Sequence, residues 1–186
     1  MKLLEIFNKP MLTDEKEIMT WVRAYVHGEK YCEFYDGKVN CANSCGIADT
    51  HNLRVQFGKI YKDFWCNKTN ITDFKGFPSI IGGNLIIENN EHLKSFKNIH
   101  KVILKIGGSG LHMVDTPVES NILGLLLIDG LSKIYHLHTG SSNTEKKSDR
   151  VRAIVIINKH LGRGKAGVID AQNEMIDAGL DAFAEL

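Results

Sequence analysis

The stretch ITDFKGFPSIIGGNLIIENNEHLKSF, residues 71–96, contains one short pattern twice. When Phe64-Trp65-Cys66 is aligned with Leu85-Ile86-Ile87, the segment 71–74 falls on 93–96 after a one-residue gap. Each copy has a short apolar strand, a turn rich in Asn or Gly, and two apolar residues three positions apart. A repeat of this kind, with a period of roughly 18 to 21 residues, is typical of a short leucine-rich-repeat solenoid.

Two further copies are predicted downstream, starting near Ile103 and near Leu123, because apolar residues follow both at similar offsets. Lys105 stands where the earlier copies have Cys66 and Ile87, so we expect a register shift in the third coil. Each coil buries two rows of side chains against its neighbours. The predicted strand row is Phe64, Leu85, Ile103 and Leu123, and the predicted turn row is Phe74, Phe96, Val114 and Ile134.

Helical patterns flank the repeat. Thr13 and Asp14 are good N-caps before an amphipathic stretch that ends by Gly28, and two more helices are predicted at 149–162 and about 166–178. We therefore predict one integrated α+β domain, in which helices at both ends cover a leucine-rich-repeat-like β-solenoid sheet. Its predicted parts are a helical cap (1–30), a strand-rich solenoid with a hairpin at Asp36-Gly37 (31–138), a linker (139–148) and a C-terminal helical segment (149–186).

The composition excludes several classes of protein. A net charge of +1 over 186 residues gives no long-range field that would recruit nucleic acid or an anionic membrane. The opening MKLLEIFNKP is too short in apolar residues for a signal peptide, and no apolar run reaches the length of a membrane span. We therefore expect a cytoplasmic protein with no membrane partner and with free thiols.

The cysteines and histidines raise two metal-site hypotheses. Cys41 and Cys45, with Cys32 and Cys66 further away, could supply four thiolates to zinc, but the spacing is not that of a zinc ribbon and Cys66 lies on a core row. His136 and His138 alternate next to His112 and could bind a metal or act as acid and base. Neither group has the accompanying residues of a known motif, so the sequence predicts a non-enzymatic protein without cofactor or metal.

A local basic segment precedes the last helix. Gly162-Arg163-Gly164-Lys165 resembles a phosphate-binding turn but lacks the P-loop spacing. This segment could bind nucleic acid phosphate or an acidic partner. Its basic residues are Lys146, Lys147, Arg150, Arg152, Lys159, Arg163 and Lys165.

Two segments carry a family resemblance. YDGKVNC (35–41) followed by LRVQFGKIYKDFWCNKTNITDFKGFPSIIGGNLIIENNEHLKSF (53–96) resembles the leucine-rich-repeat-like accessory proteins of T-even-type tailed phages. The ending IINKHLGRGKAGVIDAQNEMIDAGLDAFAEL (156–186) also looks like the tail of several of these proteins, whereas the copies after Phe96 depart from the pattern. The resemblance covers about residues 31–100.

The resemblance implies a phage origin and a binding scaffold that acts in the cytoplasm of an infected bacterial host. Its partner would be a host or phage protein. Accessory proteins of this kind often act on host defence or host takeover machinery, and an anti-DarT factor, which counters a DarT-type DNA ADP-ribosyltransferase, is one such role that the resemblance suggests.

The strand positions that face outward predict where a partner binds. Trp65, Ile86 and Leu104 are unusually apolar for exposed sites, and a row of large apolar residues tends to mark a contact surface. The alternative is that the N-terminal helix, through Trp21 and Tyr25, or the C-terminal helices lie across this face and bury it.

Overall fold

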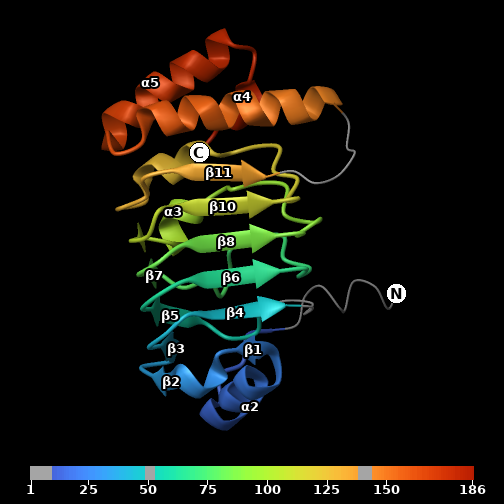
Figure 1. Cartoon of the computed structure of the whole chain (residues 1–186), viewed down its shortest axis with the longest axis vertical. Coiled ribbons are helices and arrows are strands. Elements are labelled where there is room, and N and C mark those ends of the chain that lie inside the picture. Colours follow the sequence, from blue (N-terminus) through green and yellow to red (C-terminus); the bar gives the residue numbers. More distant parts are fainter. Residues whose placement is uncertain (1–9, 49–52, 138–143) are drawn as a thin grey trace.

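The computed structural model describes residues 10–48, 53–137 and 144–186. In this part of the chain the backbone forms a β-solenoid of about four turns, with one helix at its N-terminal end and two at its C-terminal end (Figure 1). The predicted α+β solenoid with helices at both ends is therefore confirmed.

Two sheets form the walls of the solenoid. The six-stranded sheet contains, in spatial order, β1 (Val26–His27), β4 (Cys45–Ala48), β6 (Phe64–Asn67), β8 (Leu85–Glu88), β10 (Leu111–Val114) and β11 (Ile134–Leu137). The five-stranded sheet contains β2 (Cys32–Tyr35), β3 (Lys38–Cys41), β5 (Phe57–Ile60), β7 (Ile80–Ile81) and β9 (Lys105–Ile106). Neighbouring coils pair in parallel, whereas β1 with β4 and β2 with β3 pair antiparallel.

The predicted hairpin lies at the start of the five-stranded sheet. Strands β2 and β3 are joined by Asp36 and Gly37, whose φ angles are 50° and 72°. Positive φ at both central residues is the geometry of a type I′ turn, which matches the twist of a two-residue hairpin.

The first two coils have the predicted register. Phe64 pairs with Leu85, and both side chains are completely buried between the sheets. The turn row is also present here, because Phe74 and Phe96 are buried and their rings meet edge to face at 5.1 Å.

The later coils are longer than predicted. Equivalent residues of neighbouring coils are 21 residues apart at Thr69 and Asn90 but 26 apart at Asn90 and Thr116. The additional residues include the helical turn α3 (Ile99–Val102). Leu111 and Ile134 therefore occupy the strand row where we predicted Ile103 and Leu123. Those two predictions and the predicted turn positions of Val114 and Ile134 are wrong, although Ile103 and Leu123 are buried in the core.

A buried polar ladder ties three coils together after strands β6, β8 and β10. Asn90 Oδ1 accepts from the N–H (3.0 Å) and the hydroxyl (2.6 Å) of Thr69, and Asn90 Nδ2 donates to the carbonyls of Cys66 (2.8 Å) and Glu88 (3.0 Å). The Asn90 N–H donates to Thr116 Oγ1 at 3.4 Å. The side chain of Asn90 thus satisfies loop groups that the sheets leave unpaired inside the core.

The N-terminal helix α2 (Glu15–Tyr25) begins as predicted, since Asp14 accepts a hydrogen bond from the N–H of Glu17 at 3.0 Å. It ends at Tyr25, earlier than the predicted stop at Gly28, because β1 follows directly. A short helical turn, η1 (Glu29–Tyr31), leads into β2.

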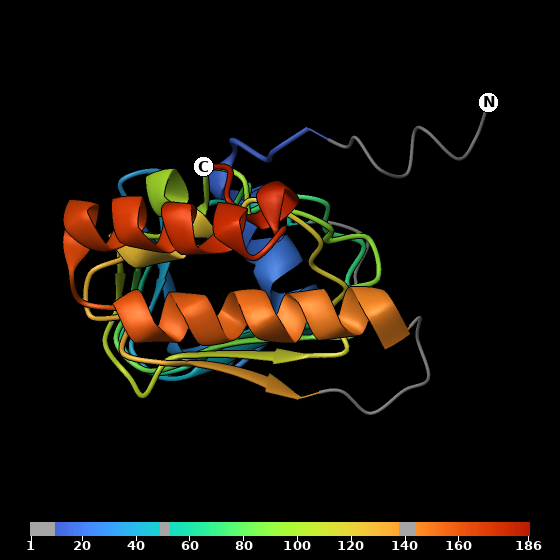
Figure 2. The same cartoon turned by 90° about the horizontal axis from the view of Figure 1, so that it is seen from above.

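The C-terminal helices stack on the last coil (Figure 2). Helix α4 (Thr144–His160) begins inside the segment 139–148 that was predicted to be a linker, and residues 139–143 lie outside the described part. Helix α5 (Gly164–Asp177) follows after Gly162, and the 3₁₀ turns η2 (Leu123–Leu127) and η3 (Asp181–Phe183) pack against it. None of the helices in the described ranges is long and apolar enough to cross a bilayer.

Candidate functional site

The outer face of the six-stranded sheet carries a row of side chains in register. Strand alternation places buried residues such as Phe64 and Leu85 inside and their neighbours outside. We call four of these outward positions the outward row: Trp65, Ile86, His112 and Tyr135. All four side chains are partly exposed, so they form a continuous surface across four coils.

Neighbouring groups contact the aromatic rings of the outward row. A Cβ added to Gly46 would lie 2.1 Å from Trp65 Nε1, so the indole covers the backbone of this glycine. The rings of His112 and Tyr135 stack with centroids 4.5 Å apart and planes 12° apart, and Lys133 Nζ lies 4.8 Å from the Tyr135 centroid. These neighbours reduce the freedom of the aromatic side chains before any partner binds.

No helix within the described ranges crosses this face (Figures 1 and 2). Helix α2 packs at the N-terminal end against β1 and β2, and Trp21 is buried there. Helix α4 packs on β11 at the other end of the solenoid. The alternative in which terminal helices bury the face is therefore wrong for the helices that the structure describes.

Leu104 does not belong to the outward row. It lies between α3 and β9, where its N–H donates to the carbonyl of Ser79 at 2.9 Å, and its side chain is exposed. Because α3 lengthens the third coil, the residue that pairs with Ile86 is His112. The prediction that Leu104 continues the row of Trp65 and Ile86 is thus wrong.

Sequence reasoning missed His112 and Tyr135 as members of this surface. Each later strand begins with a large apolar residue, Leu111 or Ile134, as β8 begins with Leu85, and its second residue takes the outward position. The sequence-based prediction assumed a constant repeat period, and the longer third coil therefore put both strands out of the predicted register.

The three histidines do not share one register position. His112 pairs with Tyr135 in the ladder, whereas His136 pairs with Met113. The side chain of His136 and all of His138 lie outside the described part of the structure.

Three of the four cysteines come together at the N-terminal end of the solenoid. The sulfur atoms of Cys32, Cys41 and Cys45 all lie within 4.8 Å of one another. Cys66 is not part of this cluster: it is buried further along the solenoid, with its sulfur 3.3 Å from Thr69 Oγ1.

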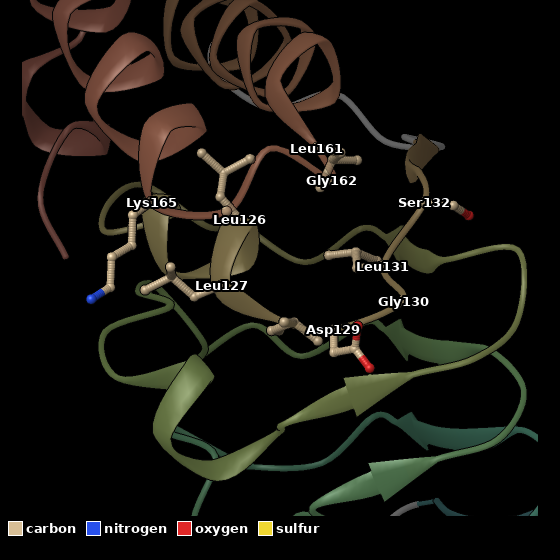
Figure 3. Close-up of a pocket in the computed structure, with 11 residues that line it drawn as sticks. Leu126, Leu127, Asp129, Gly130, Leu131, Ser132, Leu161, Gly162 and Lys165 are labelled. Carbon is tan, nitrogen blue, oxygen red and sulfur yellow. The ribbon is translucent and has the colours of Figure 1, made fainter.

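A pocket of about 570 Å³ lies where η2 faces the turn between α4 and α5 (Figure 3). Its apolar lining residues include the four leucines Leu126, Leu127, Leu131 and Leu161, together with Ile128. The charged residues that line it are Asp129, which pairs with Lys105 at 3.4 Å, and Lys165. The lining thus combines apolar side chains with an acid and a base.

The predicted basic segment is divided among several internal contacts. Arg150 is buried and its Nε donates to the carbonyl of Val118 at 2.8 Å. Arg152 bonds to Asp149 at 3.0 Å and to the carbonyl of Ala178 at 2.8 Å. Lys165 is exposed. Lys146 and Lys147 lie in α4, and their side chains are outside the described part.

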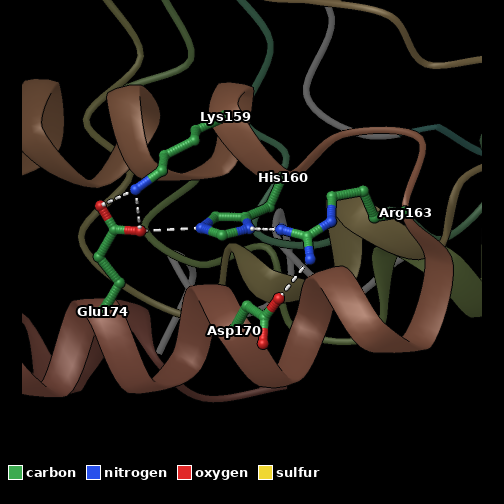
Figure 4. A network of polar contacts seen from close by, with 5 residues as sticks. All are labelled: Lys159, His160, Arg163, Asp170 and Glu174. Atoms are coloured by element: carbon green, nitrogen blue, oxygen red, sulfur yellow. Dashed lines mark hydrogen bonds and ion pairs between the residues drawn. The ribbon is translucent and has the colours of Figure 1, made fainter.

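Lys159 and Arg163 belong to a polar network between α4 and α5 (Figure 4). Lys159 Nζ lies 3.0 and 2.9 Å from the two carboxylate oxygens of Glu174, and His160 Nε2 lies 2.8 Å from Glu174 Oε2. Arg163 donates to His160 Nδ1 at 2.8 Å and to Asp170. Because Nδ1 accepts from Arg163, the imidazole carries its proton on Nε2 and donates it to Glu174. The network clamps the two helices together.

This network predicts a pH-dependent stability. Hydrogen bonds from His160 and then Lys159 hold the pKa of Glu174 below its ordinary value of 4.5. A carboxyl group with a depressed pKa in the folded state stabilises the fold above its unfolded pKa, and this contribution disappears as the pH falls through the folded pKa. In thermal melts, Glu174→Gln should therefore lower the melting temperature at neutral pH, and the difference from wild type should shrink below pH 4.5.

Asp177→Asn, at an exposed acid of the same helix, is the matched control. A gap between wild type and Glu174→Gln that is equal at neutral and acidic pH would contradict the assigned role of the network.

Comparison of the chain with protein-family models, curated proteins and solved structures gives no match in any of the three. What is shown is thus the β-solenoid fold itself, and no family is assigned to the chain.

Proposed function

We propose that this chain is a non-enzymatic accessory protein that binds another protein through the outward row of the six-stranded sheet. One observation carries the proposal: Trp65, Ile86, His112 and Tyr135 lie side by side on a sheet face that the described helices leave open. A parallel sheet is ordinarily covered on both faces, so an open face with aromatic residues favours a contact surface.

The chemistry of the face resembles that of a protein interface. Trp and Tyr are enriched among the residues that dominate binding energy, and their rings are already packed here against Gly46 and His112. The next outward positions along the strands include Asn67, Glu88 and Val114, which are partly exposed. Asn67 and Glu88 would supply a more polar border beside the aromatic and apolar centre, as interfaces commonly have.

The resemblance of residues 31–100 to phage leucine-rich-repeat-like proteins supports a more specific role. In this role the protein acts in the cytoplasm of an infected bacterial host and counters a host defence or toxin system. The partner would then be a host protein, such as a toxin, or a second phage protein.

The buried histidine has a structural role rather than a catalytic one. His160 is 4% exposed and is held between Glu174 and Arg163, so a substrate has no access to its ring. Its contacts fix the packing of α4 on α5, which is a structural task.

Removing the indole from the outward row should weaken binding without unfolding the protein. We expect Trp65→Ala to weaken the partner complex by about 30-fold or more, equivalent to about 2 kcal/mol, because Trp is a typical hot-spot residue. Immobilised wild type is used to capture proteins from a bacterial host lysate, and calorimetry then gives the affinity of each variant for the captured protein.

The control is Tyr35→Ala, which removes a ring that is 73% exposed in the β2–β3 hairpin. This variant should bind like wild type. If Trp65→Ala and Tyr35→Ala bind equally well, the outward row is not the contact surface.

Binding of nucleic acid by segment 146–165 stays a prediction with less support. The described contacts direct Arg150 into the core and pair Arg152, Lys159 and Arg163 with acids. Phosphate binding would show an affinity that falls steeply with salt, whereas an absence of such binding at low salt would remove this hypothesis.

A further inference from the structure

The cluster of Cys32, Cys41 and Cys45 joins three strands of the first coil. Cys32 in β2 and Cys41 in β3 are directly opposed in the hairpin, and Cys45 begins β4 in the other sheet. Cys41 and Cys45 are completely buried, and Cys32 is partly exposed. The cluster therefore lies beneath the surface with Cys32 as its accessible side.

The separations suit a thiophilic metal ion. Around a tetrahedral zinc with Zn–S bonds of about 2.3 Å, sulfur atoms lie roughly 3.8 Å apart. The three sulfur atoms here are within 4.8 Å of one another, so side-chain shifts of about 1 Å would bring them to bonding positions.

The backbone at Gly28 packs closely against the cluster. Gly28 packs against Cys45 with φ of 87°, and a Cβ there would lie 2.7 Å from the carbonyl of Ser44. A glycine at this position lets the backbone close over the cluster.

Ordinary core packing explains the cluster less well. A buried free thiol usually acts as a small apolar side chain, and Cys66, which lies apart from the cluster, is such a case. As thiols, Cys32 and Cys41 can donate to the carbonyl of Gly28, but the sulfur–oxygen distances of 3.7 and 3.9 Å are long for a hydrogen bond. Three thiols that converge from three strands make a soft donor set, which prefers zinc or copper(I) to magnesium or calcium.

We propose that Cys32, Cys41 and Cys45 bind one zinc ion, with water as the fourth ligand, and thereby fasten β2, β3 and β4 at the N-terminal end of the solenoid. The three thiols release their protons to solvent when the ion binds. This assignment departs from the sequence-based expectation of no metal. The zinc hypothesis considered from the sequence included Cys66 as a fourth ligand, whereas Cys66 lies apart from this cluster.

The test is a metal titration of the reduced, metal-free, full-length protein. Cobalt(II) should bind one ion per chain with the near-ultraviolet charge-transfer band of cobalt–thiolate bonds, and zinc should displace it. Zinc should also raise the melting temperature, since it binds the folded state. Cys41→Ser should weaken zinc binding by at least about a hundredfold.

Cys66→Ser is the matched control, because it changes a buried cysteine outside the cluster and should bind metal like wild type. Cys32→Ser, at the partly exposed ligand, repeats the test if Cys41→Ser fails to fold. The proposal is overturned if wild type shows no cobalt–thiolate band, or if Cys66→Ser loses as much affinity as the cluster variants. A Cys32–Cys41 disulfide that persists in reductant, seen as a loss of two hydrogens by mass spectrometry, would also overturn it.

Discussion

Phe96→Ala should lower the free energy of unfolding by about 3 to 5 kcal/mol, the usual cost of truncating a buried Phe. Phe96 is completely buried, and its ring packs edge to face on Phe74 at 5.1 Å. Its N–H donates to the carbonyl of Ser120 in the next coil at 3.2 Å, so the cavity would open between two coils. Urea denaturation followed by circular dichroism measures the loss.

Lys97→Ala changes the exposed neighbour of Phe96 and should alter the stability by less than about 0.5 kcal/mol. A change below about 1 kcal/mol for Phe96→Ala would mean that the coils do not stack through this residue.

Asn90→Ala should cost at least about 3 kcal/mol, because it leaves several buried polar groups without partners at 1 to 3 kcal/mol each. The substitution removes the acceptor of the Thr69 N–H and hydroxyl and the donor to the carbonyls of Cys66 and Glu88. These groups lie inside the solenoid, where water does not replace the amide. The same urea titration measures the effect.

Asn89→Gly is the matched control for the ladder. Asn89 is exposed with φ of 51°, a conformation that glycine adopts easily, so the variant should remain close to wild type. Equal losses for Asn89→Gly and Asn90→Ala would show that the turn, rather than the ladder, stabilises this region.

The first coils could be predicted from the sequence because their spacing is nearly constant. Residues 64–67 and 85–88 each alternate buried and outward positions, and a turn residue with positive φ follows, Lys68 in one coil and Asn89 in the next. The later coils could not be placed by the same rule. The helical turn α3 and the 3₁₀ turn η2 lengthen the loops with apolar residues that are buried. Ile103 and Leu123 therefore match the apolar pattern of the repeat although they do not lie in the strand row.

The change from constant spacing in the first coils to longer later coils also decides how much of the candidate site could be predicted from the sequence. Trp65 and Ile86 lie where the repeat predicts them, whereas Leu104 was misplaced by the longer third coil and His112 takes its position. The cysteine cluster depends on the hairpin register that opposes Cys32 to Cys41. The predicted Asp36-Gly37 turn already sets this pairing, whereas the approach of Cys45 from the other sheet does not follow from spacing along the chain.

Site-specific photocrosslinking in living cells that express the protein tests most directly whether the outward row binds a protein. A photoreactive phenylalanine analogue replaces Ile86 on the open sheet face or, as the control, Lys59, which is exposed in the five-stranded sheet. We expect position 86 to capture a discrete protein, Trp65→Ala to abolish that product, and position 59 to capture none. Capture of the same protein from position 59, with no product from position 86, would contradict the assignment of the contact surface.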